Sequence, residues 1–312
     1  MRQLLYEITH ITSYDYAGQV SVSHHQLRLS PRRTAQQRCL EEEIQIEPTP
    51  TVTSKHSDYF GNTSHFITVD RPHGRLVVTA RSRVALSPAS IPEPTETPSW
   101  EVVRTRCRGD RSGAALEAHE FTYPSPLIPR GPEYADYAAA SFIKDRPVLD
   151  AVSDLTRRIS VDFAFDPTAT TVTTPVGEFF QRRRGVCQDF AQFQIACLRS
   201  LGLSARYVSG YLETDPPPGQ TKLRGSDASH AWVSFYCPGL GWIQVAPTNN
   251  CLPSLRHIVI GWGRDYSDVA PVRGVLLGGQ RQQLRVSVDV VALGPLDEEA
   301  DEAQDQESVS EV

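Results

Sequence analysis

The 312-residue chain contains 39% hydrophobic and 22% charged residues, a composition typical of a soluble globular protein of two domains rather than a disordered or membrane protein. No apolar run reaches the roughly 18 residues that a membrane-spanning helix needs, and the first residues lack the apolar stretch of a signal peptide, so we expect a cytoplasmic protein that contacts no membrane. The formal charge of −6 comes from residues 297–312, which hold eight acidic residues and no basic one. The rest of the chain carries a net charge of +2, which argues against nucleic-acid binding.

Residues 1–86 contain five β-rich segments separated by Gly, Pro, Asp and Asn. Their alternation of apolar and polar residues predicts short strands, and strands at this spacing favour an N-terminal antiparallel β-sandwich domain. Residues 87–99 are rich in Pro, Ser and Thr, and we expect a linker or crossover over residues 87–125.

Residues 126–294 are expected to form a second domain of mixed helices and strands, because helical patterns precede β-like segments there. An amphipathic helix is predicted directly after residue 187, where apolar residues recur every three or four positions and Gly202 follows as a stop signal. These apolar residues are Phe190, Phe193, Cys197, Leu198 and Leu201. Residues 295–312 are too acidic and polar to bury a core, so we expect a disordered, solvated tail.

The six cysteines are scattered without a CxxC pair, which predicts reduced thiols and neither a metal site nor a cofactor. Cys187 differs from the others because it comes directly before the predicted helix. Backbone N–H groups and the positive end of the helix dipole favour a thiolate at this position, and the Cys187 N–H could stabilise an oxyanion. His230, in a predicted strand, could act as its base. A buried structural cysteine and a hydrogen-bonded strand histidine are the alternatives.

Two stretches resemble a known family. Residues 182–211 (RRRGVCQDFAQFQIACLRSLGLSARYVSGY) and 228–249 (ASHAWVSFYCPGLGWIQVAPTN) are similar to the bacterial transglutaminase-like superfamily, and the β-rich N-terminal region resembles the β domain that precedes the core in its bacterial members. The resemblance implies an α+β fold with a papain-like core, in which a cysteine-bearing helix packs on an antiparallel sheet. It also implies a Cys-His-Asp triad, with Cys187 and His230 in the first two positions.

The activity that the resemblance implies is cysteine-dependent acyl transfer on amide bonds of peptides or proteins. The reaction passes through a thioester intermediate and ends in hydrolysis or in glutamine–amine cross-linking.

The third triad position departs from the family motif. That motif usually ends D-P-T-N, whereas this chain reads WIQVAPTNN and has Ala246 at the aspartate position. An alanine side chain cannot accept the imidazole N–H, and replacing the aspartate of a serine triad lowers turnover by roughly 10⁴-fold. Asn249, Asn250 or Asp227 could orient His230 instead. The alternatives are an acyl transferase of reduced competence and a catalytically inactive peptide-binding module of the same fold.

Overall fold

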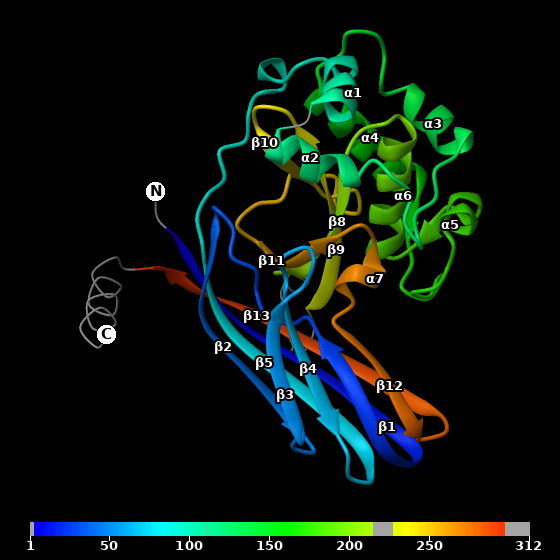
Figure 1. The fold of residues 1–312 in the computed structure, drawn as a ribbon. Helices are drawn as coiled ribbons and strands as arrows, with labels where there is room; N and C mark the ends of the chain where they lie inside the picture. The colour runs from blue at the N-terminus through cyan, green and yellow to red at the C-terminus, as the bar shows by residue number, and fades with distance from the viewer. Residues whose placement is uncertain (1–2, 111, 215–226, 297–312) are drawn as a thin grey trace, which may run out of the picture.

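A seven-stranded antiparallel sheet forms the lower part of the molecule in Figure 1. The computed structural model describes residues 3–110, 112–214 and 227–296. The strands of this sheet are β1 (Leu4–Leu27), β2 (Gln37–Glu47), β3 (Val52–Ser57), β4 (Thr63–Val69), β5 (His73–Leu86), β12 (Val272–Gly278) and β13 (Gln282–Pro295). The first half of β1 pairs with β5 and β13, and its second half pairs with β4 and β12.

Strand β1 joins the two halves of this sheet. The sequence pattern predicts two separate strands here, but no proline interrupts the range, so the chain stays extended throughout. Leu27 and Ile67 from one half share an apolar cluster with Leu76 and Val78 from the other. The predicted β-sandwich is therefore one continuous sheet whose halves enclose a common core.

The second layer is a helix packed on a four-stranded antiparallel sheet, in the order β10-β9-β8-β11. Its elements are α6 (Cys187–Ser200), β8 (Ala205–Leu212), β9 (Ala228–Cys237), β10 (Gly241–Val245) and β11 (His257–Gly263). The predicted apolar stripe lies inside, since Phe190, Phe193, Cys197 and Leu198 are all buried. This arrangement confirms the predicted α+β fold class with its cysteine-bearing helix on an antiparallel sheet.

Further short elements cover the core. They are η1 (Pro94–Glu96), α1 (Trp100–Gly109), α2 (Gly113–Glu120), α3 (Pro132–Ala139), α4 (Val148–Asp162), β6 (Ala164–Phe165), α5 (Val176–Arg182), β7 (Arg184–Gly185) and α7 (Tyr266–Val269). Helices α1 and α2 fall within the predicted linker, yet Val103, Cys107, Ala115 and Ala118 join the same buried cluster as α6. The proline-rich residues 87–99 are therefore followed by two helices, α1 and α2, that pack into the core.

The end of the described chain returns to the N-terminal sheet. Strand β12 and all but the last residue of β13 lie within residues 126–294, predicted as the second domain. Both strands nevertheless pair with β1, and Leu4 is opposite Pro295. Tyr6 and Val288 from this sheet share an apolar cluster with Tyr211 and Ile258 from the core sheet. The predicted domain boundaries stay predictions, and residues 297–312 of the predicted tail lie outside the described residues.

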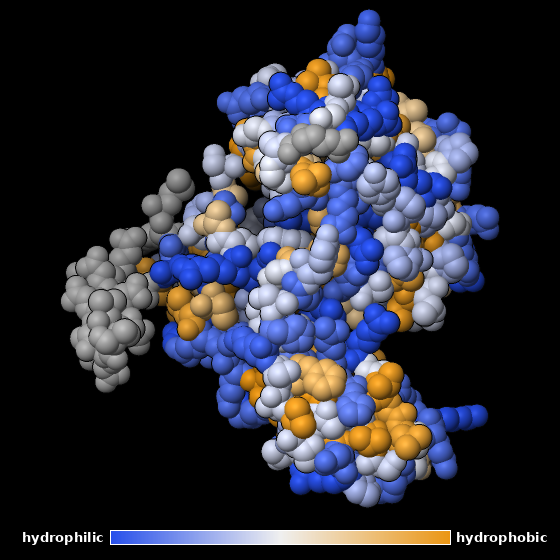
Figure 2. All heavy atoms as spheres, in the orientation of Figure 1, coloured by the Kyte–Doolittle hydropathy of each residue, from blue (hydrophilic) through white to orange (hydrophobic). Residues whose placement is uncertain are grey.

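Apolar side chains also reach the surface. Figure 2 shows them gathered near the end of the sheet that Figure 1 labels β1 and β12, and the exposed residues on β12 and β13 include Val275, Leu277, Leu284 and Val286. In the described part of the chain, no helix has both the length and the apolar character that crossing a membrane requires.

Candidate active site

Cys187 is the first residue of α6, and its position depends on a tight turn before the helix. The Asp189 carboxylate accepts hydrogen bonds from the Val186 N–H at 2.8 Å and from the Thr170 hydroxyl at 2.6 Å, which ties down the first turn. Gly185 precedes this turn, and a Cβ there would lie 2.5 Å from an Asp189 oxygen and 2.8 Å from the Phe179 ring. Only glycine therefore fits beside the helix start.

Cys187 is half-buried as a residue, but its sulfur is shielded from water and accepts from the backbone N–H groups of Ala231 and Gln188. Burial raises the pKa of the Cys187 thiol to about 11, although these two N–H groups act in the opposite direction. The sequence predicts a lowered pKa from the helix N-terminus. That prediction is wrong in direction, because the loss of water around the sulfur outweighs the backbone donors.

The backbone N–H that reaches the Cys187 sulfur belongs to Ala231, the residue after His230 in β9, so this strand brings His230 to the start of α6. The His230 Nε2 atom is 2.9 Å from the Asn249 Oδ1 atom. A carbonyl oxygen only accepts, so Nε2 carries the proton and Nδ1 has a free lone pair. Burial lowers the pKa of His230 to about 4, against a smaller opposite effect of Asn249. Both catalytic candidates are therefore neutral at rest.

The thiol and the imidazole do not form a hydrogen bond with each other in the described structure. Catalytic contacts of this kind are often long in the absence of substrate and shorten when it binds.

Ala246 lies at the end of β10, where its backbone pairs with Cys251. Its side chain is fully buried among Val208, Trp232 and Val259. The third triad position is thus an apolar contact in this chain and offers no acceptor to His230.

Of the three substitute orienters that the sequence suggests, Asn249 is the one that the structure brings to His230. Asn250 is exposed and has a φ of 49°, which places it in a left-handed turn. The Asp227 carboxylate accepts from the backbone N–H and hydroxyl of Thr214 and from the Val290 N–H. Asp227 therefore connects the core to β13 and does not orient the imidazole.

A second histidine, which the sequence gives no reason to select, lies beside the first. The rings of His257 and His230 have centroids 6.4 Å apart, and the His257 ring is 5.4 Å from that of Trp232. The Trp232 indole N–H donates to the Gln244 side chain at 2.6 Å. Burial is the largest of the effects that lower the pKa of His257 to about 4. These side chains form a neutral wall behind His230.

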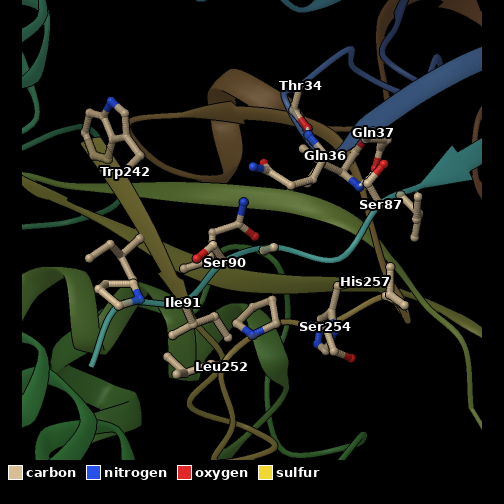
Figure 3. Close-up of a pocket in the computed structure, with 18 of the residues that line it drawn as sticks. Thr34, Gln36, Gln37, Ser87, Ser90, Ile91, Trp242, Leu252, Ser254 and His257 are labelled. Atoms are coloured by element: carbon tan, nitrogen blue, oxygen red, sulfur yellow. Dashed lines mark hydrogen bonds between the residues drawn. The ribbon is translucent and has the colours of Figure 1, made fainter. Parts of the chain in front are cut away.

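A cavity of about 500 Å³ is lined by His257 and Gln244 of this wall. Figure 3 shows side chains from three parts of the chain around it, with Gln36 and Gln37 from the N-terminal domain, Ser90 from the linker, and Trp242 and His257 from the core sheet. None of Cys187, His230 and Asn249 belongs to its lining. The cavity is therefore separate from the reacting groups.

Comparison with known proteins identifies the family. Residues 6–85 match the model of the bacterial transglutaminase-like N-terminal region, and residues 136–247 match that of the transglutaminase-like superfamily. The uncharacterized protein Rv2569c of Mycobacterium tuberculosis is 41% identical over 298 residues, which cover 92% of each chain. A protein-glutamine gamma-glutamyltransferase of Pseudomonas aeruginosa is 35% identical over 100 residues, which cover 29% of this chain and 15% of that protein.

A solved structure supports the assignment at the level of the fold. The crystal structure of a "Putative Cysteine Protease" from Cytophaga hutchinsonii superposes with a TM-score of 0.76 at 21% identity, and the match covers 95% of this chain and 93% of that one. Both the N-terminal sheet and the helix-on-sheet core are therefore shared. On the sequence matches to both regions and on this common fold, the chain belongs to the transglutaminase-like superfamily, with the bacterial transglutaminase-like N-terminal region preceding its core.

Proposed function

We propose that this protein is a cysteine-dependent acyl transferase that acts on amide groups of peptides or proteins. Two contacts support the proposal. The N–H of Ala231, the residue after His230, reaches the Cys187 sulfur, and the His230 imidazole contacts the Asn249 amide oxygen. Nucleophile, base and orienting acceptor occur in this order in Cys-His-Asn triads of papain-like proteases. The name of the Pseudomonas relative, a protein-glutamine gamma-glutamyltransferase, supports the same reaction class.

The first half of the reaction forms a thioester. The Cys187 sulfur attacks the carbonyl carbon of the substrate amide while the Nδ1 atom of His230 takes the thiol proton. The carbonyl oxygen becomes an oxyanion, which the Cys187 N–H at the helix start can stabilise. The C–N bond then breaks, and the leaving amine or ammonia takes the proton from the imidazolium. Because thiol and imidazole are both neutral at rest, proton transfer accompanies the attack rather than preceding it.

The second half returns the enzyme to its starting state. Water or a primary amine attacks the thioester carbonyl, and His230 removes a proton from the attacking group. The C–S bond breaks, and the sulfur recovers its proton from His230. Water gives the acid, and an amine gives a new amide.

Asn249 fixes the imidazole tautomer in both halves. Its oxygen holds the proton on Nε2 and leaves the Nδ1 lone pair for the thiol. An amide carries no charge, so it stabilises the imidazolium less than an aspartate would. We therefore propose a working triad of reduced competence, Cys187–His230–Asn249. The cytoplasmic location expected from the sequence stays a prediction.

The test uses a glutamine-containing peptide with and without a fluorescent primary amine. Ammonia release and amine incorporation are measured for the native chain, for Cys187→Ala as the blank, and for Cys39→Ala as a matched control at another half-buried cysteine. We expect activity in the native chain and in Cys39→Ala, and none in Cys187→Ala. Ammonia release alone would indicate a hydrolase, and amine incorporation a cross-linking enzyme. If the native chain does not exceed the blank, the catalytic proposal is wrong, and binding of the unmodified peptide would favour the inactive peptide-binding module.

A further inference from the structure

A second cavity, of about 660 Å³, lies between the N-terminal domain and the core, away from Cys187 and His230. Its walls come from the loops around Arg32 and Phe60, from the end of α2 at Glu117, and from three strands of the core sheet. These strands are β8, β10 and β11. They contribute Arg206, Trp242 and Trp262, respectively.

Guanidinium and indole groups alternate along one wall of this cavity. The Arg206 Cζ atom is 3.7 Å from the centre of the Trp262 ring and 4.1 Å from that of Trp242. The Arg32 Cζ atom is 3.5 Å from the same Trp262 ring. Both indoles pack on the Arg206 guanidinium, and indoles on its faces would leave the edge of its terminal N–H groups for a ligand in the cavity that Arg206 lines.

Arg206 makes no ion pair among the described residues, although the charge of Glu117 acts on it. The Arg206 side chain is 7% exposed, and its buried Nε atom makes no hydrogen bond. Burial lowers the pKa of Arg206 well below its usual value, and the nearby Arg32 adds to this effect while Glu117 opposes it. A buried guanidinium without an anion is unfavourable, and an anion bound in the cavity would satisfy it.

We propose that this cavity binds a ligand with a single carboxylate attached to an apolar or aromatic group. The open edge of Arg206 presents parallel N–H bonds in one plane, the geometry that a carboxylate accepts with both oxygens. Arg32 supplies a second positive charge, and the aromatic side chains, including Phe60 and Phe121, provide the apolar walls. Glu117 and Glu120 also line the cavity, so a doubly charged phosphate would be repelled more strongly than a carboxylate. This site is independent of acyl transfer at Cys187.

The test measures binding of phenylacetate by titration calorimetry and by tryptophan fluorescence, since two of the four tryptophans line the cavity. Phenylacetamide is the neutral control of the same shape, and inorganic phosphate is the control for another anion. We expect saturable binding of phenylacetate with a change in fluorescence. Phenylacetamide should bind about tenfold or more weakly, because hydrogen bonds to charged groups are roughly twice as strong as neutral ones. Phosphate should also bind more weakly, because it lacks the apolar group and its second charge is repelled by Glu117 and Glu120.

Variants locate the site. Arg206→Lys keeps the charge but loses the planar edge, and we expect phenylacetate to bind about tenfold more weakly. Arg32→Gln should weaken binding by a smaller factor, and it tests the site if Arg206→Lys does not fold. Arg104→Lys is the matched control, because Arg104 also lies over an indole, that of Trp100, at 4.7 Å but lines neither this cavity nor the one behind His257. Cys187→Ala should bind as the native chain does.

Any one of several results would overturn the proposal: no saturable binding of phenylacetate, equal binding of phenylacetamide, tighter binding of phosphate, or affinity unchanged in both Arg206→Lys and Arg32→Gln. Loss of binding in Cys187→Ala would place the ligand in the active site and would equally refute the second site.

Discussion

Replacing Asn249 by alanine removes the hydrogen-bond acceptor of His230 in this structure. The bond is 2.9 Å long and joins two neutral groups, so its net contribution is about 0.5–1.5 kcal/mol, or about 2- to 12-fold in rate if it acts fully in the transition state. A further loss comes from the tautomer. Without the acceptor, the ring proton can move to Nδ1, and that form cannot take the thiol proton.

Asn249→Asp tests the same contact in the opposite direction. A carboxylate at this position favours the imidazolium and should raise the pKa of His230 from its value of about 4 by about 1–3 units. His230 must be unprotonated to accept the thiol proton, so activity is lost as the pH falls through its pKa. The acidic limb of the pH–rate profile should therefore move to higher pH in Asn249→Asp, and turnover above this limb should increase.

The assay is kcat/KM on the glutamine peptide between about pH 4 and pH 8, which reports the pKa values of the free enzyme. Asn250→Ala is the matched control, since this neighbouring asparagine is exposed and does not contact His230. We expect it to behave as the native chain does. The reasoning fails if Asn249→Ala and Asn250→Ala are equally active, or if Asn249→Asp leaves the acidic limb unchanged.

Three further predictions follow from the burial of the groups concerned. Ala246→Asp should raise amide turnover by much less than the roughly 10⁴-fold known for an aspartate in a serine triad, because Asn249 already provides an acceptor. It should also lower the melting temperature, because a carboxylate enters an apolar cluster. A gain in turnover that persists when Cys187→Ala is added would contradict this prediction. The rate of Cys187 alkylation by iodoacetamide should be low near about pH 6 and rise up to about pH 9, because the pKa of its thiol is about 11. This rate should still exceed the alkylation rate of the buried Cys197. Equal rates at both thiols, measured by mass spectrometry, would argue against a nucleophile. Burial lowers the pKa values of His10 and His257 to about 4, so between this value and about 6.5 the unfolded chain binds more protons than the folded one. Each histidine should therefore remove about 1.4 kcal/mol of stability per pH unit as the pH falls from about 6.5 to about 4. A melting temperature that does not fall over this range would refute the reasoning.

The sequence alone determines the elements whose signals are local. Apolar residues at helical spacing define α6, and the residue before the stripe is Cys187. The strand that carries His230 alternates over a short range, and the family motif links the two residues. These features depend on neighbours a few positions apart, and so the pattern of a single segment is sufficient to predict them.

Only the tertiary structure decides what depends on distant segments. The sequence offers Asn249, Asn250 and Asp227 equally, and the turn after β10 determines that Asn249 reaches the imidazole. The last strands pair with β1, as Leu4 with Pro295, because a sheet edge is satisfied by any compatible strand however remote in the chain. The direction of the Cys187 pKa is decided in the same way. The helix start is visible in the sequence, but the desolvation that outweighs it comes from the packed core around the thiol.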